Sequence, residues 1–278
     1  MPSQLYLRDY LLAFIISSYG KKVKLSVYVL AYNEEAKIAD TIKSVTWADE
    51  IVVIDSFSTD RTVEISKELG AKVVQVKFEG FGKLRLAGIE HTSHNWIFSI
   101  DSDERCTLEA KEEIIDTINQ ESSKDAYFMP RRNIFMGKKI RFCGWYPDYR
   151  QPQLFKRGNL TYESNDLVHE GYKVIGTTGY LKKAIIQIPF LSYSALIQKM
   201  DRYTDLGAEK IIKKNKSYSY FNISVRSIWA FIQTYIIKLG MFDGWQGFVI
   251  AFCNMEGTFF KYAKYKELVR EKSKTLNE

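Results

Sequence analysis

Residues 97–104 have the sequence IFSIDSDE, in which an apolar run ends in three acidic residues. Apolar runs of this length are typical of strands buried in a parallel sheet. Asp101, Asp103 and Glu104 would then lie at the carboxyl end of the strand, where open α/β sheets bind their ligands. Carboxylates this close repel one another and lose hydration unless a cation or hydrogen-bond donors approach them. The stretch therefore indicates either a divalent metal that holds an anionic substrate, or a solvated turn before the next helix.

Strand-like and helix-like segments alternate through the first hundred residues. The strand-like runs are residues 25–30 (LSVYVL), 50–54 (EIVVI), 72–76 (KVVQV) and 96–100 (WIFSI). Between them, the apolar spacing predicts helices over residues 34–45, up to Leu69, and over residues 83–91, with Asn33 as the N-cap of the first. This alternation predicts a parallel, doubly wound α/β sheet with right-handed crossovers. Polar residues after three of the strands (Tyr32 to Glu34, Asp55, and Asp101 with Asp103) would then meet at one edge.

Composition limits the classes of protein to consider. The chain has 278 residues, of which 46% are hydrophobic and 26% charged, which is typical of a globular protein. Its formal charge of +7 indicates an anionic partner: a nucleic acid, nucleotide phosphates or an acidic membrane surface. Three scattered cysteines fit a reducing cytosol better than a disulfide framework.

Glycine-rich phosphate loops do not explain the positive charge. The sequence has no GxxxxGK[ST] motif, which excludes a P-loop. Gly80 and Gly82 lack the third glycine of GxGxxG and follow the third strand, so a dinucleotide site is weakly supported. We therefore expect a metal, and no glycine loop, to hold the phosphates.

The first hundred residues resemble a known family. The segments LSVYVLAYNEEAKIADTIKSV, ADEIVVIDSFSTDRTVEI, GAKVV, GFGKLRLAGI and NWIFSIDSDE look like the nucleotide-sugar domain of family 2 inverting glycosyltransferases. They are most similar to the branch with lipopolysaccharide-core β-1,4-glucosyltransferases, and the resemblance extends from Leu25 to the C-terminus. It implies a GT-A fold, which is a Rossmann-like, mostly parallel sheet, here with a C-terminal helical extension. It also implies a UDP-sugar donor and Mg²⁺ or Mn²⁺ as cofactor.

The same resemblance assigns roles to individual residues, position by position. Ala31, Tyr32 and Glu34 match the motif that lines the uridine, and Asp55 matches the acid that hydrogen-bonds the uracil. Arg85, with Lys83 close by, falls where relatives carry a basic residue near the diphosphate. Asp101 matches the acid that touches the ribose or a metal-bound water, and Asp103 the acid that holds the metal. Leu86 departs from the Asn of many relatives.

Structural roles compete with these assignments. Asp55 could belong to a turn before a helix, Tyr32 could simply pack, and Arg85 could be a solvated charge on a helix. Mg²⁺ prefers few carboxylates plus phosphate oxygens, which suits Asp101 and Asp103. Glu104 is expected to be a charge at the start of the next helix or a residue behind the site.

A second polar cluster, residues 165–170 (NDLVHE), is the candidate source of the catalytic base. Inverting transfer needs a carboxylate that takes the proton of the acceptor hydroxyl as it attacks the anomeric carbon. The resembled family has an LVHE motif here, which assigns the base to Glu170 and makes Asp166 the second choice. His169 is a candidate metal ligand or orienting residue. A structural ion pair for Glu170 and simple packing for His169 are the alternatives.

The last third of the chain is helical in pattern and rich in aromatic residues. We divide the chain into an N-terminal segment (1–21), a catalytic domain (22–190) and a helical region (191–278). Residues 224–239 and 245–264 would form a helical hairpin that packs on the core or lies in a membrane interface with basic residues at the headgroups. An anionic membrane surface is therefore an expected partner, and a peripheral location on the inner face of the cytoplasmic membrane is expected. Residues 266–278 are expected to be a frayed tail.

The leading hypothesis is a metal-dependent inverting glycosyltransferase that moves a hexose, with glucose the first choice, from a UDP-sugar to a bacterial glycolipid such as lipopolysaccharide core. A non-catalytic basic protein that binds a membrane surface is one alternative. A glycosyltransferase that acts on a protein or another glycan is a second, and a nucleotidyltransferase a third. No basic, aromatic RNA motif or zinc spacing is present, so no nucleic-acid partner is expected.

Overall fold

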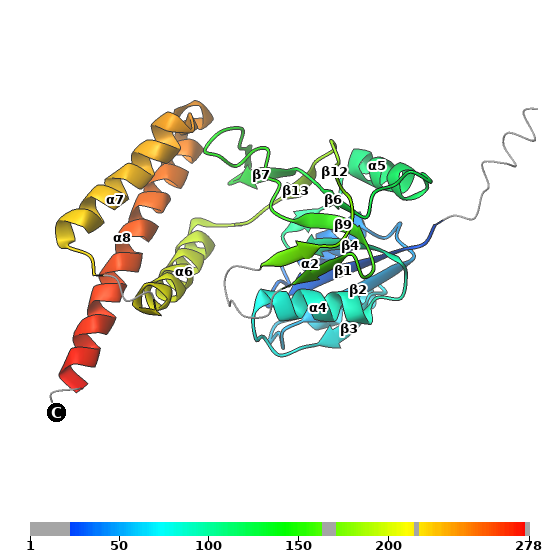
Figure 1. Cartoon of the computed structure of the whole chain (residues 1–278), viewed down its shortest axis with the longest axis horizontal. Helices are drawn as coiled ribbons and strands as arrows, with labels where there is room; N and C mark the ends of the chain where they lie inside the picture. Colours follow the sequence, from blue (N-terminus) through cyan, green and yellow to red (C-terminus); the bar gives the residue numbers. More distant parts are fainter. Residues whose placement is uncertain (1–22, 163–170, 214–216, 276–278) are drawn as a thin grey trace, which may run out of the picture.

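The computed structural model describes residues 23–162, 171–213 and 217–275 (Figure 1). The predicted N-terminal segment and the candidates Asp166, His169 and Glu170 lie outside the described residues. The strands are β1 (Leu25–Ala31), β2 (Glu50–Asp55), β3 (Lys72–Gln75), β4 (Trp96–Asp101), β5 (Glu104–Arg105), β6 (Ala126–Phe128), β7 (Arg131–Phe135), β8 (Lys138–Lys139), β9 (Pro152–Lys156), β10 (Leu160–Tyr162), β11 (Tyr172–Val174), β12 (Thr178–Tyr180) and β13 (Ile185–Gln187). The helices are α2 (Ile38–Ser44), α3 (Thr62–Glu68), α4 (Phe81–His91), α5 (Leu108–Ile118), α6 (Tyr193–Lys213), α7 (Tyr220–Ile232), η1 (Gln233–Ile237), η2 (Gly240–Asp243) and α8 (Gly244–Thr275).

The central sheet has seven strands in the order β12-β6-β9-β4-β1-β2-β3. Strands β4, β1, β2 and β3 run parallel, as the alternation of segments predicts, and β9 runs antiparallel to both β4 and β6. The four predicted strands are all present, with ends that differ by one residue at most. Two smaller sheets, β5-β13-β7-β8 and β10-β11, complete the strand-containing part.

Helices cover both faces of the central sheet, and β1 shows how its sequence produces two cores. Every residue of β1 is buried. Its alternate side chains point to opposite faces of the sheet, and helices cover both faces. Val27 and Val29 pack with apolar residues of α2 and α5 on one face. Tyr28 and Leu30 pack with α4 through Leu84 on the other. Because β1 is buried between β2 and β4, its carboxyl end lies at the edge of the sheet where the candidate site is found.

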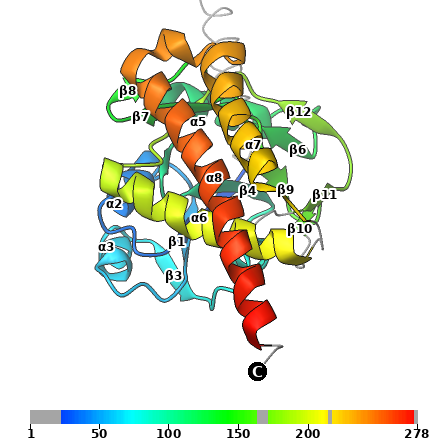
Figure 2. The ribbon, with the colours of Figure 1, turned by 90° about the vertical axis from the view of Figure 1, so that its left-hand side faces the viewer.

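The C-terminal helices form a separate layer that is attached to the small sheet. Phe135 and Ile140 from the β7–β8 region pack with Leu196 of α6 and Ile250 of α8. Helices α6, α7 and α8 pack on one another, and Figure 2 shows them on the side that faces the viewer. In the described part of the chain, no single helix is long and apolar enough to cross a membrane. The pair Tyr220–Ile237 and Gly240–Glu271, which bends by 71°, meets the length and composition criteria only when taken together.

Two expectations about element boundaries are wrong. The helix predicted from residue 34 begins only at Ile38, and Asn33 is no N-cap because it adopts a left-handed conformation with φ of 53°. The expected frayed tail from residue 266 is helical as far as Thr275, the end of α8.

Candidate active site

The carboxyl ends of β1, β2 and β4 lie side by side, as predicted. In the register of the sheet, Ala31 is opposite Asp55, and Leu30 is opposite Asp101. Because the three strands are parallel, the loops that follow them leave from the same edge. The sheet therefore brings together the residues that the sequence assigns to the nucleotide and those that it assigns to the metal.

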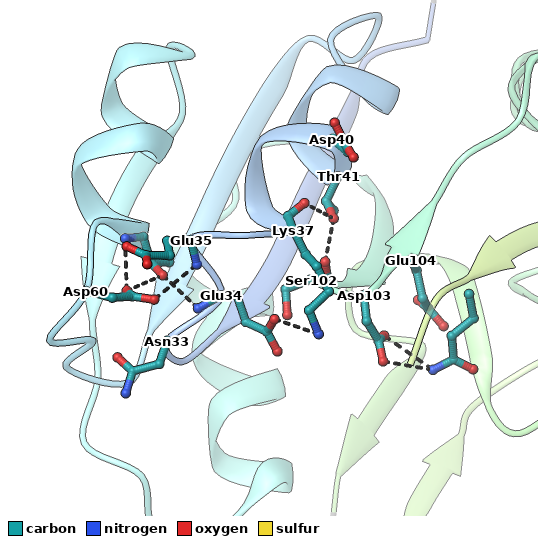
Figure 3. A network of polar contacts seen from close by, with 12 residues as sticks. Asn33, Glu34, Glu35, Lys37, Asp40, Thr41, Asp60, Ser102, Asp103 and Glu104 are labelled. Carbon is teal, nitrogen blue, oxygen red and sulfur yellow. Dashed lines mark hydrogen bonds and ion pairs between the residues drawn. The ribbon is translucent and has the colours of Figure 1, made fainter. Parts of the chain in front are cut away.

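The loops after β1 and β2 are fastened to each other by side-chain to backbone hydrogen bonds. The backbone N of Asn33 donates to Ser58 Oγ over 2.8 Å, and the Asn33 side chain accepts from the backbone N of Thr59 at 2.8 Å. Asn tolerates left-handed backbone better than most residues, which explains why this position turns before the helix starts. Farther along, the backbone N of Glu35 donates to Asp60 Oδ2 at 3.1 Å, which Figure 3 shows beside Asn33. These bonds hold the two loops together at the rim of the site and do not involve Asp101 or Asp103.

Asp55 is buried and satisfied largely by its own turn. Its carboxylate accepts from the backbone N of Ser58 at 3.1 Å, from Ser58 Oγ at 2.5 Å and from Gln75 Nε2 at 3.2 Å. Asp55 therefore does belong to a turn before a helix, as the structural alternative predicts. A contact with uracil stays a prediction.

Tyr32 and Glu34 differ in how they meet the solvent. Tyr32 is half exposed, so it does not simply pack in the core. Glu34 forms an ion pair of 2.7 Å with Lys37. Burial raises the pKa of Glu34 against the effect of Lys37, and the nearby Asp103 carboxylate raises it further. Figure 3 shows Glu34 and Asp103 approaching the same space from two different loops.

Asp101 is held by a buried arginine from α4. Arg85 Nη2 lies 3.1 Å from Asp101 Oδ1, and Arg85 Nη1 donates to Ser99 Oγ at 3.1 Å. Burial disfavours the ionised form of Asp101, but Arg85 and Arg131 outweigh it and hold the pKa of Asp101 below its usual value. The alternative of a solvated Arg85 is wrong, because only 5% of this residue is exposed. Its side chain reaches from the helix into the site and neutralises the first acid.

Asp103 forms no such ion pair with a described residue. The residue is 8% exposed, and Gln187 Nε2 of β13 lies 3.3 and 3.4 Å from its two carboxylate oxygens. Among the described residues, no lysine, arginine or histidine lies within ion-pair distance of Asp103. A buried carboxylate costs free energy unless a positive charge compensates it. Asp103 therefore has both the charge and the spare acceptor positions that a metal ligand needs.

Glu104 lies behind the two aspartates and not at the start of a helix. Its Oε1 accepts from Arg131 Nε at 2.5 Å, and its Oε2 accepts from the backbone N of Asp101 at 2.9 Å and from Gln153 Nε2 at 3.1 Å. Burial raises the pKa of Glu104 to about 7, with Arg131 opposing and Asp101 and Asp103 reinforcing the shift. No sequence pattern indicates that Arg131 and Gln153 belong to the site, because both come from strands far along the chain.

Helix α6 contributes residues that the sequence does not assign to the site. Burial raises the pKa of the Tyr203 phenol, and the charges of Asp103 and Asp101 add to this effect. Lys199, one turn earlier on α6, contributes a stabilising charge to Glu34. The charges at the edge of the sheet thus act on side chains of the first C-terminal helix. No local pattern in residues 193–213 distinguishes this from an ordinary amphipathic helix.

Lys83 lies apart from this network. Its Nζ is 2.5 Å from Glu79 Oε2, and both side chains are about half exposed. Its predicted role near the diphosphate stays a prediction, as do the roles of Asp166, His169 and Glu170. The described residues contain no cluster of three or more histidine, cysteine or acidic side chains around a common point. A metal here would thus have one or two ligands from the described residues, which fits an ion completed by phosphate oxygens and water.

Comparison with known proteins decides the family. The model for "Glycosyl transferase family 2" matches residues 26–187, more than half of the chain, and includes β1, β4 and the acids that follow β4. The chain belongs to glycosyl transferase family 2. The predicted family is therefore confirmed, and so is the prediction of an enzyme with a GT-A fold and C-terminal helices. The non-catalytic alternative is set aside.

Relatives of this glycosyltransferase cover nearly its whole length. An uncharacterized glycosyltransferase of Rickettsia typhi is 27% identical over 88% of this chain and 87% of its own. The lipopolysaccharide core biosynthesis glycosyltransferase LpsC of Rhizobium meliloti is 25% identical over 87% of this chain and 92% of its own. Among solved structures, TarS (residues 1–349) of S. aureus matches 90% of this chain and 92% of that chain, with 15% identity and a TM-score of 0.47.

Proposed function

We propose that this glycosyltransferase transfers a hexose, with glucose the first candidate, from a UDP-sugar to a bacterial glycolipid with inversion at the anomeric carbon. The observation that carries the proposal is the contrast between the two acids after β4. Asp101 forms an ion pair with Arg85, whereas Asp103 is buried without an ion pair among the described residues. A buried carboxylate without an ion pair is a position where a bound metal would supply the missing positive charge.

Asp103, with Asp101 beside it, would hold Mg²⁺ or Mn²⁺. When bound, the ion would neutralise the charge that develops on the departing diphosphate. Ala31, Tyr32, Glu34 and Asp55 would bind the nucleoside at the rim that the two fastened loops form. Arg85 would act through Asp101, which it orients. Lys83 would approach the diphosphate from the start of α4.

On the acceptor side, the proposed base is Glu170, with Asp166 as the second candidate and His169 as an orienting residue or ligand. The base takes the proton of the acceptor hydroxyl while the oxygen bonds to the anomeric carbon and the bond to the diphosphate breaks. A bacterial glycolipid is proposed as acceptor because LpsC, a lipopolysaccharide core enzyme, aligns with most of the chain. The proposed place of action is the inner face of the cytoplasmic membrane.

Donor hydrolysis in the absence of acceptor tests this proposal. The purified enzyme would be incubated with Mn²⁺ and UDP-glucose, UDP-galactose or their N-acetyl forms, and released UDP measured. We expect one donor to be preferred and hydrolysis to stop in EDTA. Glu170→Gln should retain UDP binding and lose turnover. Turnover that persists unchanged in EDTA, or in Asp103→Ala, would rule out the metal site, whereas an active Glu170→Gln enzyme would move the base elsewhere.

A further inference from the structure

Helix α7 has two apolar faces, and only one of them is packed. Ile223 lies in a buried cluster with tyrosines of α8, and Thr234 Oγ1, in the following η1 turn, accepts from Asn254 Nδ2 of α8 at 3.0 Å. The opposite face carries Phe221, Val225, Ile228, Trp229 and Ile236, each between 48% and 75% exposed. Spacings of three, four, seven and eight residues place these side chains on one side of a helix. A helix that only packs on α8 needs one apolar face, so packing on α8 does not explain the second.

The exposed apolar surface continues through the turn into α8. Ile237, Leu239, Met241, Phe242 and Trp245 are between 42% and 64% exposed. A groove of about 360 Å³ between α7 and α8 is lined by Ile228 and by Phe252, Phe259 and Phe260 of α8. We call the exposed face of α7, this turn and this groove the apolar hairpin surface. Contiguous exposed apolar patches on a folded protein mark interaction sites or membrane contacts.

The charges on and beside this surface are mostly positive. From residue 217 to residue 256 the acids are Asp243 and Glu256. Asp243 is buried and accepts from the backbone N of Arg141 and of Phe142, and Glu256 lines the groove. Arg226 and Lys238 are exposed in the same segment. Lys139 lies beside the turn. Repulsion from Arg132 lowers its pKa, and burial and repulsion from Arg141 add to this effect. Among the residues that the structure describes, Lys139, Arg141 and Lys238 have no acidic partner.

We propose that the apolar hairpin surface docks on a membrane that contains anionic lipids, with its aromatic side chains inserted at the depth of the headgroups. Exposed tryptophan and phenylalanine next to unpaired lysine and arginine are typical of helices that lie in a bilayer interface. Anionic lipids supply the negative charge that the cations beside the turn lack. A second copy of the chain fits less well, because a two-fold interface would bring the same cations of both copies together.

This surface goes beyond the proposed sugar transfer and does not depend on it. Docking can be measured without any donor, so a failure of docking is distinct from a failure of catalysis. Figure 1 shows α6 between the sheet and the α7–α8 hairpin. The charge of Asp103 contributes to the raised pKa of Tyr203 on this helix.

Flotation of the full chain with lipid vesicles tests the proposal. Vesicles of phosphatidylcholine alone would be compared with vesicles that contain one quarter phosphatidylglycerol, at low and at physiological salt. We expect binding to the anionic vesicles that weakens with salt, and much weaker binding to neutral ones. The double variant Phe242→Ser, Trp245→Ser should lower the partition coefficient by about tenfold or more, since two large apolar side chains are lost. Leu108→Ser, which removes an exposed leucine of α5, is the matched control and should bind like wild type.

A readout that needs no variant is the quenching of wild-type tryptophan fluorescence by brominated lipids. Quenching on anionic vesicles is expected, because Trp229 and Trp245 lie on the docking surface. Equal binding to neutral and anionic vesicles, or a double variant that binds like wild type, would overturn the proposal. It would also be overturned by a wild-type dimer in light scattering that the double variant converts to a monomer while neither binds vesicles. That result would assign the surface to a second copy.

Discussion

Arg131 Nε lies 2.5 Å from Glu104 Oε1, and the two side chains are 2% and 0% exposed. The other oxygen of Glu104 accepts from the backbone N of Asp101, so the ion pair supports the segment that presents both aspartates to the site. The pair connects β7 and β5 of the small sheet, and the bond from Asp101 to Glu104 joins that sheet to the end of β4 in the central sheet. Its loss should affect both the stability of the fold and the geometry of the site.

Replacing Glu104 by glutamine should be strongly destabilising. The change keeps the shape of the side chain but leaves the buried Arg131 guanidinium without its closest negative charge. Breaking one side of a buried ion pair costs about 3–5 kcal/mol. Urea unfolding of Glu104→Gln should show a lower free energy of unfolding by this order. Glu64→Gln, which breaks the exposed pair with Arg61, is the control and should change little.

Replacing Arg131 by methionine should be destabilising in a way that depends on pH. Glu104 already has its pKa raised to about 7 by burial, and removal of the opposing Arg131 charge raises it further. Below the unfolded-state pKa the acid is neutral in both states, so the variant loses least there. As pH rises toward and above 7, the unfolded state ionises freely while the folded state must ionise a buried acid, and stability falls.

The measurement is urea unfolding of wild type and Arg131→Met in EDTA at pH 5.5, 7 and 8.5. The difference in the free energy of unfolding should grow with pH. A constant difference, or one that shrinks at high pH, would show that Glu104 does not become a neutral acid in the variant.

Arg85 and Lys83 lie two residues apart on α4 but should behave differently. Arg85→Gln removes the buried charge that neutralises Asp101, so it should lower both the stability and the kcat/KM for the donor. Lys83→Gln breaks only an exposed pair and should leave the stability unchanged, while raising the KM for the donor if Lys83 reaches the diphosphate. Thermal melts and donor kinetics on both variants separate the two roles. Equal effects on stability would contradict the buried position of Arg85.

The cysteine thiols should be unreactive in the native protein. Burial raises the pKa of Cys106 and of Cys143 to about 12, and it also raises that of Cys253. Thiolates are the reactive form, so a disulfide reagent at pH 8 should modify the native protein slowly and the urea-unfolded protein at all three positions at once. One rapidly modified thiol in the native state would contradict this description.

The sequence predicts the part of the site that follows from strand order. Buried strands of alternating βα units end at one edge, so the order of the strands along the chain is enough to place Asp55, Asp101 and Asp103 together. It does not predict the left-handed conformation of Asn33, because that turn depends on hydrogen bonds to Ser58 and Thr59 in the next loop. Nor does it predict the pairing of Arg131 with Glu104 or the approach of Tyr203, because these contacts join distant segments through tertiary packing.

The central claim is that Asp103 holds a metal that a nucleoside diphosphate completes. The most direct measurement is the melting temperature of wild type, Asp103→Asn and the surface control Asp116→Asn with UDP plus Mn²⁺, and with UDP plus EDTA. Ligands that bind only the folded state raise the melting temperature. We predict an increase for wild type and Asp116→Asn that EDTA removes, and none for Asp103→Asn. An increase of the same size in Asp103→Asn, or in wild type with EDTA, would contradict the claim.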